Sequence, residues 1–370
     1  MPASMTSKTV GLFLLGGTHH ILHLIPMAAE LSKDEEIDVV VLVTSAEERD
    51  ICERLLKGMG LVGADIRLLK ANPILRLISP KLAVLFSNMF RLNRLDAVVV
   101  AERTSTILRS ALKMMPLYIQ TQHGAGGRIG GYDQRLRHFD HVLVPGEKDK
   151  IRLIDMGLVS AETCHVTGLM KPYVLRKLNP DRPKLFERDQ PTVLYTPHFT
   201  EAQSSWPEFG RELLDKFAAT PHMNFIVAPH IRLFKDSPKE SRAPIEAYGE
   251  HPNILVDLGS PLTTDMTYTL GADIYLGDVS SQVYEFLWKP KPCVFVGSED
   301  TDWQGSADYT HWRFGQVCHT ADAVMMALES AQADHDQYIE MQKYGSLASV
   351  GHPDWNPVKR AADVVRSLLR

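Results

Sequence analysis

The sequence has few cysteines and no two of them at the spacing of a metal or redox motif. Its four cysteines, Cys52, Cys164, Cys293 and Cys318, are scattered over 370 residues without a CxxC pair. A structural zinc site and a disulfide framework both need clustered cysteines, so neither is expected. Isolated cysteines of this kind are typical of a protein of the reducing cytoplasm.

The sequence also lacks a surplus of basic residues and any targeting or membrane-spanning segment. Its net charge is −5, whereas nucleic-acid-binding proteins usually carry an excess of lysine and arginine. The N-terminal segment MPASMTSKTVGLFLLGG lacks the basic start, long apolar core and cleavage site of a signal peptide. No uncharged run reaches the length that crosses a bilayer. We therefore expect a cytoplasmic protein with no nucleic-acid partner.

The two commonest nucleotide-binding motifs are missing from the first turn, GGTHHILHLIPM. This turn has neither a GxGxxG nor a Walker lysine, which excludes the usual dinucleotide-binding and P-loop signatures. It does offer glycines for a tight turn and a helix start that could face an anion. Gly17, His20 and His23 are thus candidate site residues, with structural or capping roles as the alternative for each histidine. Because no carboxylate or cysteine accompanies the histidines at ligand spacing, we expect no metal.

Acidic residues are absent from residues 66–95, which contain six basic residues among Leu, Ile, Phe and Met. A basic and apolar segment of this kind can lie on an anionic membrane surface. The alternative is an ordinary helical hairpin that packs on a sheet and keeps its charges in water. The first hypothesis makes the protein peripheral on the inner face of the cytoplasmic membrane.

Apolar, β-branched runs alternate with helical patterns in both halves of the chain. Continuous runs of this kind fit strands that are buried on both faces of a parallel sheet. The fold class is therefore α/β, with two doubly wound, Rossmann-like domains that face each other across a cleft. The expected strands lie at 9–17, 37–45, 65–71, 95–102, 116–122, 139–146, 164–169, 192–197, 225–230, 253–258, 272–278, 292–297 and 315–320.

A segment rich in proline and charge, residues 176–192, separates the two series and is expected to be a linker. We place an N-terminal domain at 1–178 and a C-terminal domain at 190–352. Residues 353–370 are expected to form a helix that starts at Asn356–Pro357 and packs back on the N-terminal domain. Ligands of such sheets bind beyond the carboxyl ends of the strands, so the chemistry is expected there.

The segment YIQTQHGAGGR, residues 118–128, ends a predicted strand with a histidine at the point where the chain turns. At a strand end that faces a second domain, His123 is the best candidate for a general base, because imidazole titrates near neutral pH. The following glycines leave room for a substrate to approach the backbone. The alternative is a turn histidine without a chemical role.

The segment GDVSSQVYEFLW, residues 277–288, follows a buried strand with an acidic residue and two serines. A helix is expected to begin near Ser280, and its free N–H groups and the hydroxyls of Ser280 and Ser281 suit a phosphate. The alternative is that Asp278 or Ser280 only caps the helix.

Two further histidines follow a strand and a proline. They are His198 in VLYTPHFTE and His230 in FIVAPH. Either histidine could act as a base or donate to a phosphate, and Arg232 supplies a fixed positive charge. Loop histidines without a role remain the alternative.

Taken together, these motifs resemble the CDP-glycerol glycerophosphotransferases, the teichoic-acid polymerase family. YIQTQHG resembles the strand-end WHG motif of that family, and VLYTPHFTE resembles the opening of its second domain. FIVAPH resembles the second-domain strand that ends in histidine. The block from SPLTTDMTY through DVSSQVYEF to KPKPCVFV resembles its serine block and the strand that follows. The likeness covers about residues 116–300.

The resemblance implies a GT-B fold and a nucleotide-activated donor, CDP-linked by analogy. It implies that His123 is the candidate catalytic base and that His230 is either a ligand of the donor phosphate or a second essential catalytic histidine. The donor-binding set is Asp278, Ser280, Ser281, Glu285, Arg232, His198 and Thr264. The chain departs from the family where Gln122 replaces a tryptophan and Val279 replaces a tyrosine. The resemblance also implies that the N-terminal domain is the acceptor side and that the C-terminal domain binds the nucleotide donor. The acceptor-side set is then Gly17, His20, His23 and Arg128, which stands in for a displaced basic residue.

The resemblance predicts a transferase that moves glycerol phosphate or a related alditol phosphate from a CDP-activated donor to a hydroxyl acceptor. Such a step belongs to the synthesis of cell-surface polysaccharide or glycolipid, and the acceptor could be lipid-linked. The first alternative is an inverting GT-B glycosyltransferase with a nucleotide sugar, in which Glu285 contacts ribose or sugar hydroxyls and His23 is the candidate base. The second is a non-hydrolysing nucleotide-sugar 2-epimerase, although Gly124 and Ala125 stand where that family has a carboxylate. The third is a non-catalytic nucleotide-binding protein.

Overall fold

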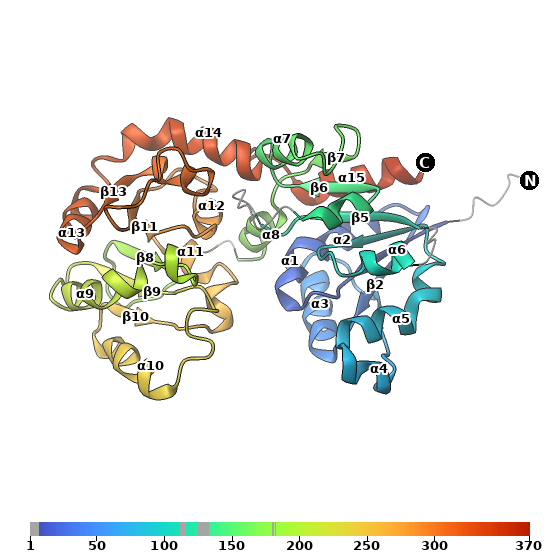
Figure 1. Ribbon diagram of the computed structural model, residues 1–370, viewed down its shortest axis with the longest axis horizontal. Helices are drawn as coiled ribbons and strands as arrows, with labels where there is room; N and C mark the ends of the chain where they lie inside the picture. The colour runs from blue at the N-terminus through green and yellow to red at the C-terminus, as the bar shows by residue number, and fades with distance from the viewer. Residues whose placement is uncertain (1–6, 112–115, 125–132, 180, 182) are drawn as a thin grey trace, which may run out of the picture. The chain divides into compact units, whose positions relative to one another are not determined.

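The computed structural model describes residues 7–111, 116–124, 133–179, 181 and 183–370. Arg128, the expected acceptor-side cation, lies outside the described residues. The chain divides into two compact units, which are Met1–Leu178 with Ser349–Arg370 and Asn179–Ala348. Each unit is a parallel sheet with helices against it (Figure 1). The arrangement of the two units across a cleft stays a prediction.

The sheet of the first unit is parallel throughout and has the strand order β3-β2-β1-β4-β5-β6-β7. Each strand overlaps a run that the sequence predicted, and all but β1, which begins one residue early at Lys8, lie wholly within it. Side chains alternate between the two faces, so Val10 and Leu12 enter one core while Phe13 enters the other. The strands are β1 (Lys8–Phe13), β2 (Ile37–Val43), β3 (Asp65–Leu68), β4 (Ala97–Val100), β5 (Leu117–Thr121), β6 (His141–Val144) and β7 (Cys164–Val166).

Helices cover both faces of this sheet, which explains why its strands are apolar on both sides. One core contains residues of α1 (Ile21–Leu24), α2 (Pro26–Leu31), α3 (Ala46–Gly58), α8 (Met170–Leu178) and α15 (Pro357–Leu369). The other contains residues of α5 (Pro80–Leu92), α6 (Thr106–Ala111), η3 (Gln134–His138) and α7 (Glu147–Asp155). The short helices η1 (Thr18–His20) and α4 (Pro73–Ile78) complete the described helices of this unit.

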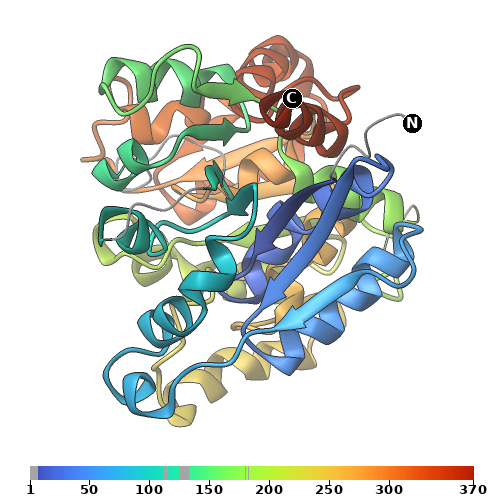
Figure 2. The same cartoon turned by 90° about the vertical axis from the view of Figure 1, so that its right-hand side faces the viewer.

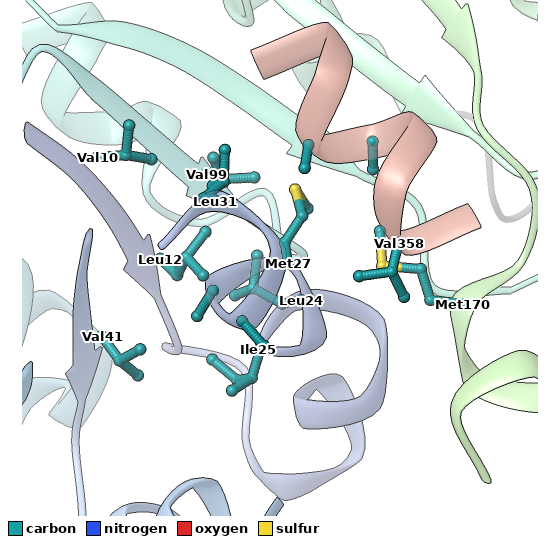
Figure 3. Packing of buried hydrophobic residues seen from close by; sticks show 14 of the residues in the cluster. Val10, Leu12, Leu24, Ile25, Met27, Leu31, Val41, Val99, Met170 and Val358 are labelled. Carbon is teal, nitrogen blue, oxygen red and sulfur yellow. The ribbon is translucent and has the colours of Figure 1, made fainter. Parts of the chain in front are cut away.

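The C-terminal helix α15 belongs to the first unit although it follows the whole of the second. It begins where the Asn356 side chain accepts a hydrogen bond from the Lys359 N–H at 3.0 Å, with Pro357 in the first turn. Val358 lies beside Met170 in the core (Figure 3). Arg366 forms an ion pair with Asp34 at 3.5 Å. Helix α15 therefore packs on α2 and α8.

The sheet of the second unit is also parallel, in the order β10-β9-β8-β11-β12-β13. Its strands again match the predicted runs, except that β9 begins one residue early at Asn224. They are β8 (Thr192–Thr196), β9 (Asn224–Val227), β10 (Ile254–Val256), β11 (Ile274–Gly277), β12 (Cys293–Val296) and β13 (Gln316–Cys318). One core of this unit packs under α9 (Trp206–Ala218) and α13 (Ala321–Ser330).

The remaining helices of the second unit are short, apart from the one that leads back to the first unit. They are η4 (Glu201–Gln203), α10 (Lys239–Glu246), η5 (Ala247–Glu250), η6 (Pro261–Thr263), α11 (Thr267–Gly271), α12 (Gln282–Phe286), η7 (Ala307–Phe314), η8 (His335–Tyr338) and α14 (Ile339–Val350). Helix α12 is shorter than expected. It starts after Ser281 and ends at Phe286, because Leu287 leaves the helical conformation and Pro290 follows.

The strand orders locate the ligand-binding edge in each unit. In the first sheet the chain runs outward from β1 to β3 and then returns to the other side of β1 with β4. In the second it runs outward from β8 to β10 and returns beside β8 with β11. Ligands of open parallel sheets bind at the carboxyl ends of the strands where the order reverses. The relevant ends are those of β1 and β4 in one unit and of β8 and β11 in the other.

Candidate functional site

Four histidines from two strand ends gather at the reversal point of the first sheet. His19, His20 and His23 follow β1, while His123 follows β5, the strand next to β4. The ring centroids of His20 and His123 lie 4.4 Å apart, those of His19 and His20 4.0 Å apart, and those of His23 and His123 6.3 Å apart. The structure thus brings together three predicted residues, His20, His23 and His123, from positions about a hundred residues apart in the sequence.

Two glycines make the turn after β1 compatible with this cluster. Gly17 has a φ of 105°, a conformation that side-chain-bearing residues rarely adopt. A Cβ atom on Gly16 would lie 1.9 Å from Nδ1 of His20. The glycine pair therefore gives the turn its shape and leaves space for the His20 ring.

The hydrogen bond of His123 fixes which of its nitrogens carries the proton. Its Nδ1 lies 3.0 Å from the carbonyl oxygen of Ala101, at the end of β4. A carbonyl oxygen can only accept, so Nδ1 donates and the neutral ring carries its lone pair on Nε2. His123 is exposed, and its Nε2 makes no hydrogen bond to a described residue. Nε2 is therefore available to accept a proton from a ligand.

The electrostatics of the cluster keep its rings neutral. Burial, followed by the charges of His123, His19 and Lys81, lowers the pKa of His20 from 6.5 to about 2. Burial, followed by the charge of Lys171, lowers the pKa of His23 well below 6.5. Loss of hydration also lowers the pKa of His123, although the hydrogen bond to Ala101 opposes the shift. His123 is thus a neutral imidazole at physiological pH.

Two cations near the histidines were missed by the sequence analysis. Arg103 follows β4, its side chain is 17% exposed, and its charge contributes to the low pKa of His123. Lys171 lies in the first turn of α8, is 8% exposed and acts in the same way on His23. No sequence motif marks these residues, because their nearness to the histidines depends on strand order. They make this edge of the sheet electropositive.

The carboxylate that follows Ala101, whose carbonyl binds His123, is already engaged. Glu102 is 7% exposed and accepts hydrogen bonds from the backbone N–H groups of Thr104 and Ser105. These bonds shape the turn after β4. Glu102 is therefore committed to the turn that carries Arg103, and His123 presents an exposed neutral imidazole at the end of the neighbouring strand β5.

In the second unit, Asp278 organises the strand end and is turned away from solvent. The side chain is 2% exposed, and its carboxylate accepts from the N–H groups of His198 at 2.9 Å and Val279 at 2.6 Å. It also accepts from the N–H and Oγ–H of Ser205, at 2.8 and 2.9 Å. Burial raises the pKa of Asp278, while these bonds favour the charged form. Its oxygens hold the loop 198–205, so it positions the site rather than contacting a donor.

His198 and His230, after β8 and β9, have the tautomer opposite to that of His123. The Nδ1 of His198 accepts from the Thr200 N–H at 3.2 Å, and the Nδ1 of His230 accepts from the Arg232 N–H at 3.2 Å. In the neutral rings Nε2 therefore carries the proton and donates. His198 is 2% exposed and buried in the unit, whereas His230 is half-buried, so of the two it is His230 that suits hydrogen bonding to a phosphate oxygen.

An aromatic ring that the sequence analysis missed joins these groups. The Phe199 ring centroid lies 4.5 Å from the His198 centroid and 4.5 Å from the His230 centroid. The guanidinium of Arg232 lies over the same ring, 5.3 Å from its centroid. Phe199 thus holds two histidines and an exposed arginine in one group, next to the loop that Asp278 organises.

The other predicted donor-binding residues differ in their burial and hydrogen bonds. Ser280 is buried, and its Oγ accepts from the Gln282 N–H at 3.4 Å; Ser281 is the N-terminal cap position of α12 without a capping hydrogen bond from its side chain. Glu285 lies half-buried in α12. Thr264 donates its hydroxyl to the Pro261 carbonyl at 3.0 Å, next to the 3-10 helix η6.

Neither site contains the ligand set of a metal centre in the described part of the chain. No group of three or more His, Cys, Asp or Glu side chains there is placed to hold a metal ion. The charged groups of the sites are instead arginine, lysine and a carboxylate committed to backbone N–H groups. Both sites therefore suit an anionic ligand that is bound by cations and N–H donors.

Comparisons with known proteins show what the fold is. The sequence matches no protein-family model and no curated protein. The structure is similar to that of Staphylococcus aureus MnaA with UDP, at a TM-score of 0.65 and 15% identity, covering 98% of this chain and 97% of the other. It is similar to UDP-GlcNAc 2-epimerase from Neisseria meningitidis bound to UDP-GlcNAc, at 0.63 and 16%, covering 98% and 99%.

A third similar structure belongs to the family that the motifs resemble. It is the wall teichoic acid polymerase TagF, in a histidine variant with CDPG, at a TM-score of 0.64 and 13% identity, covering 98% of this chain and 89% of the other. Together these likenesses show that the chain has the two-domain α/β fold of GT-B proteins.

Proposed function

We propose that the protein is a transferase that uses a nucleotide-activated donor, with a nucleotide sugar as the preferred donor class. The observation that carries the proposal is the pair of opposite histidine tautomers. His123 carries an accepting Nε2 in one unit, and His230 carries a donating Nε2 beside Arg232 in the other. Transfer from a diphosphate-linked substrate requires a base for the acceptor hydroxyl and a hydrogen-bond donor that stabilises the leaving diphosphate.

In the proposed step, Nε2 of His123 takes the proton of an acceptor hydroxyl as its oxygen attacks C1 of the donor sugar. The bond between C1 and the diphosphate oxygen breaks, and the nucleoside diphosphate leaves with the electron pair. The Nε2–H of His230 and the guanidinium of Arg232 stabilise the charge on the leaving diphosphate. The proton then passes from His123 to water. The proposal requires that both units act on one donor and involves no metal.

The engaged carboxylates favour transfer over epimerisation. An epimerase of this fold would be expected to need a free carboxylate near His123, but Glu102 is bound to backbone N–H groups. In the second unit the oxygens of Asp278 are occupied by the loop 198–205. The neutral imidazole of His123 is then the base, which suits activation of a hydroxyl.

A CDP-linked alditol is the second candidate donor. The likeness to TagF with CDPG and the DVSS block at 278–281 favour it. The donor would then be attacked at the β-phosphorus, and CMP would leave. The choice of donor thus decides which bond breaks, but His123 and His230 would have the same roles with either donor.

The test measures donor binding and turnover separately. Melting shifts are recorded with UDP-sugars, CDP-glycerol and CDP-alditols, and the donor that binds is then assayed with hydroxyl acceptors. We expect a shift with at least one UDP-sugar. We expect His123→Asn to keep that shift but lose about 10²–10⁴-fold in turnover, and His230→Asn to reduce the shift. His251→Asn, an exposed histidine elsewhere in the second unit, is the control.

Each other outcome identifies a different function. A shift with CDP-glycerol alone assigns alditol-phosphate transfer and rejects the sugar donor. Formation of an epimerised nucleotide sugar without any acceptor assigns an epimerase. Absence of a shift with every nucleotide, in a protein that melts cooperatively, overturns the proposal as a whole.

A further inference from the structure

The hairpin of α4 and α5 carries large apolar side chains that the fold leaves exposed. Helix α4 has six residues and none of them is buried. Ile74 is 73% exposed, Leu77 88%, Ile78 80% and, in α5, Phe90 73%. Large apolar residues that are grouped in this way on a surface usually mark an interaction site.

The hairpin is held in place by polar contacts and by one face of α5. Asn72 caps α4 by accepting from the Ile74 N–H at 2.9 Å, and Ser79 caps α5 by accepting from the Leu82 N–H at 3.5 Å. Asn88 donates to the Lys70 carbonyl at 2.8 Å. Ala83, Val84, Leu85 and Leu92 enter the core of the first unit. The apolar residues of α4 are thus presented by a defined structure and are unnecessary for its packing.

Six cations lie in the segment that carries these apolar side chains, and only one of them pairs with an acidic residue in the described part of the chain. Residues 66–95 contain no Asp or Glu, and Arg67 is the basic residue of this segment that pairs, with Asp65 outside it. The other basic residues are exposed and form no ion pair within the described part of the chain; they are Lys70, Arg76, Lys81, Arg91 and Arg94. The surface therefore combines an apolar tip with unneutralised positive charge.

We propose that the α4–α5 hairpin binds the surface of an anionic lipid membrane. The side chains of Ile74, Leu77, Ile78 and Phe90 enter the boundary between headgroups and acyl chains, and the surrounding cations contact lipid phosphates. No described helix is long and apolar enough to cross a bilayer, so the binding is interfacial. A second copy of the chain fits this surface poorly, because an isologous contact would bring the two sets of cations together.

The position of the hairpin determines which end of the first unit would face the membrane. It lies at the end of the unit opposite α15 (Figures 1 and 2). Lys81, in the first turn of α5, is close enough to His20 for its charge to lower the pKa of that histidine. One cation of the hairpin is thus within electrostatic range of the histidine cluster. This position suits an acceptor hydroxyl carried on a membrane lipid; that extension rests on the proposed function, whereas membrane binding does not.

The experiment is flotation of the full chain with vesicles of pure phosphatidylcholine or of phosphatidylcholine with phosphatidylglycerol. We expect binding to the anionic vesicles at low salt, little binding to the neutral ones, and release as NaCl is raised, because salt screens the attraction. The double variant L77E/I78E should bind at least about tenfold more weakly. Met326→Glu, which changes a 73%-exposed methionine of α13, is the matched control and should bind like the original protein.

The cations are tested in the same assay. The double variant R76A/R91A should bind about 25-fold more weakly, which is about fivefold for each basic residue near an anionic surface. The control is K235A/K239A, two exposed lysines of the second unit. Circular dichroism melts of all variants show that each is folded.

Three results would overturn the proposal. The first is a folded protein that stays in solution with anionic vesicles at low salt. The second is equal binding of the original protein, L77E/I78E and R76A/R91A. The third is a dimer in size-exclusion chromatography that L77E/I78E dissociates, without any vesicle binding, because it would assign the hairpin to self-association.

Discussion

At the scale of single residues, the same side chain acquires opposite chemistry from its hydrogen-bond partner. The carbonyl of Ala101 makes Nδ1 of His123 a donor, whereas the N–H of Arg232 makes Nδ1 of His230 an acceptor. The remaining nitrogen is therefore an acceptor in His123 and a donor in His230. A histidine at a strand end cannot be assigned as base or acid until this partner is known.

The pKa of His123 leads to a prediction for the pH dependence of the proposed activity. A base acts in its neutral form, so kcat/KM should fall as the pH falls through the pKa of His123. Because that pKa is lowered from 6.5, the acid limb should lie below pH 6.5. The measurement is the pH profile of kcat/KM with the donor that the binding assay identifies.

A variant of a neighbouring cation controls this prediction. The charge of Arg103 contributes to the low pKa of His123, so Arg103→Gln should move the acid limb to higher pH. A purely structural effect of Arg103 would change the rate without moving the limb. An acid limb above pH 6.5 in the original protein would count against His123 as the base.

At the scale of elements, a buried carboxylate holds the second site together. Asp278 follows β11 and binds the loop that follows β8, the two strands between which the sheet order reverses. The Asp278 carbonyl also accepts from Nε2 of His311 and Nε1 of Trp312, both at 2.8 Å. The arrangement of His198, Phe199 and His230 therefore depends on Asp278.

We predict that Asp278→Asn lowers the free energy of unfolding by about 2–4 kcal/mol. The amide keeps the shape of the carboxylate, but its NH₂ group would face N–H donors where an oxygen now accepts. Urea unfolding followed by circular dichroism measures the change. Asp300→Asn, at an exposed position of the same unit, should stay within about 0.5 kcal/mol of the original. Equal stability of Asp278→Asn and the original would show that the loop is held by other contacts.

At the scale of the whole molecule, the buried histidines make folding sensitive to acid. His20 and His23 are each 5% exposed, and burial lowers the pKa of each in the folded state. The unfolded chain takes up protons below the ordinary pKa of 6.5, but the folded chain does not. Above pH 6.5 these two histidines do not change the free energy of unfolding. Below pH 6.5 they lower it progressively.

We predict that the free energy of unfolding falls below pH 6.5 with a contribution of up to about 1.4 kcal/mol per pH unit from each of these histidines. Urea unfolding at several pH values between 7.5 and 4.5 measures the slope. His20→Asn should make the slope shallower by the share of one histidine, whatever its effect on stability at pH 7.5. An unchanged slope in this variant would mean that His20 is protonated in the folded protein.

The sequence by itself determined the α/β class and the strand positions. Strands buried on both faces need continuous apolar, β-branched runs, and each run is a local signal that can be read without knowing its neighbours. The start of α15 at Asn356 and Pro357 is local in the same way, since a cap involves residues three apart.

Only the tertiary structure decided which residues share a site and what each of them does there. Arg103, Lys171 and Phe199 carry no motif, because their neighbours come from strands and helices far away in the sequence. Asp278 was expected to contact a donor, but its oxygens are used by a loop some eighty residues earlier in the chain. Strand order brings such segments together, and strand order follows from the packing of the whole sheet rather than from any local pattern.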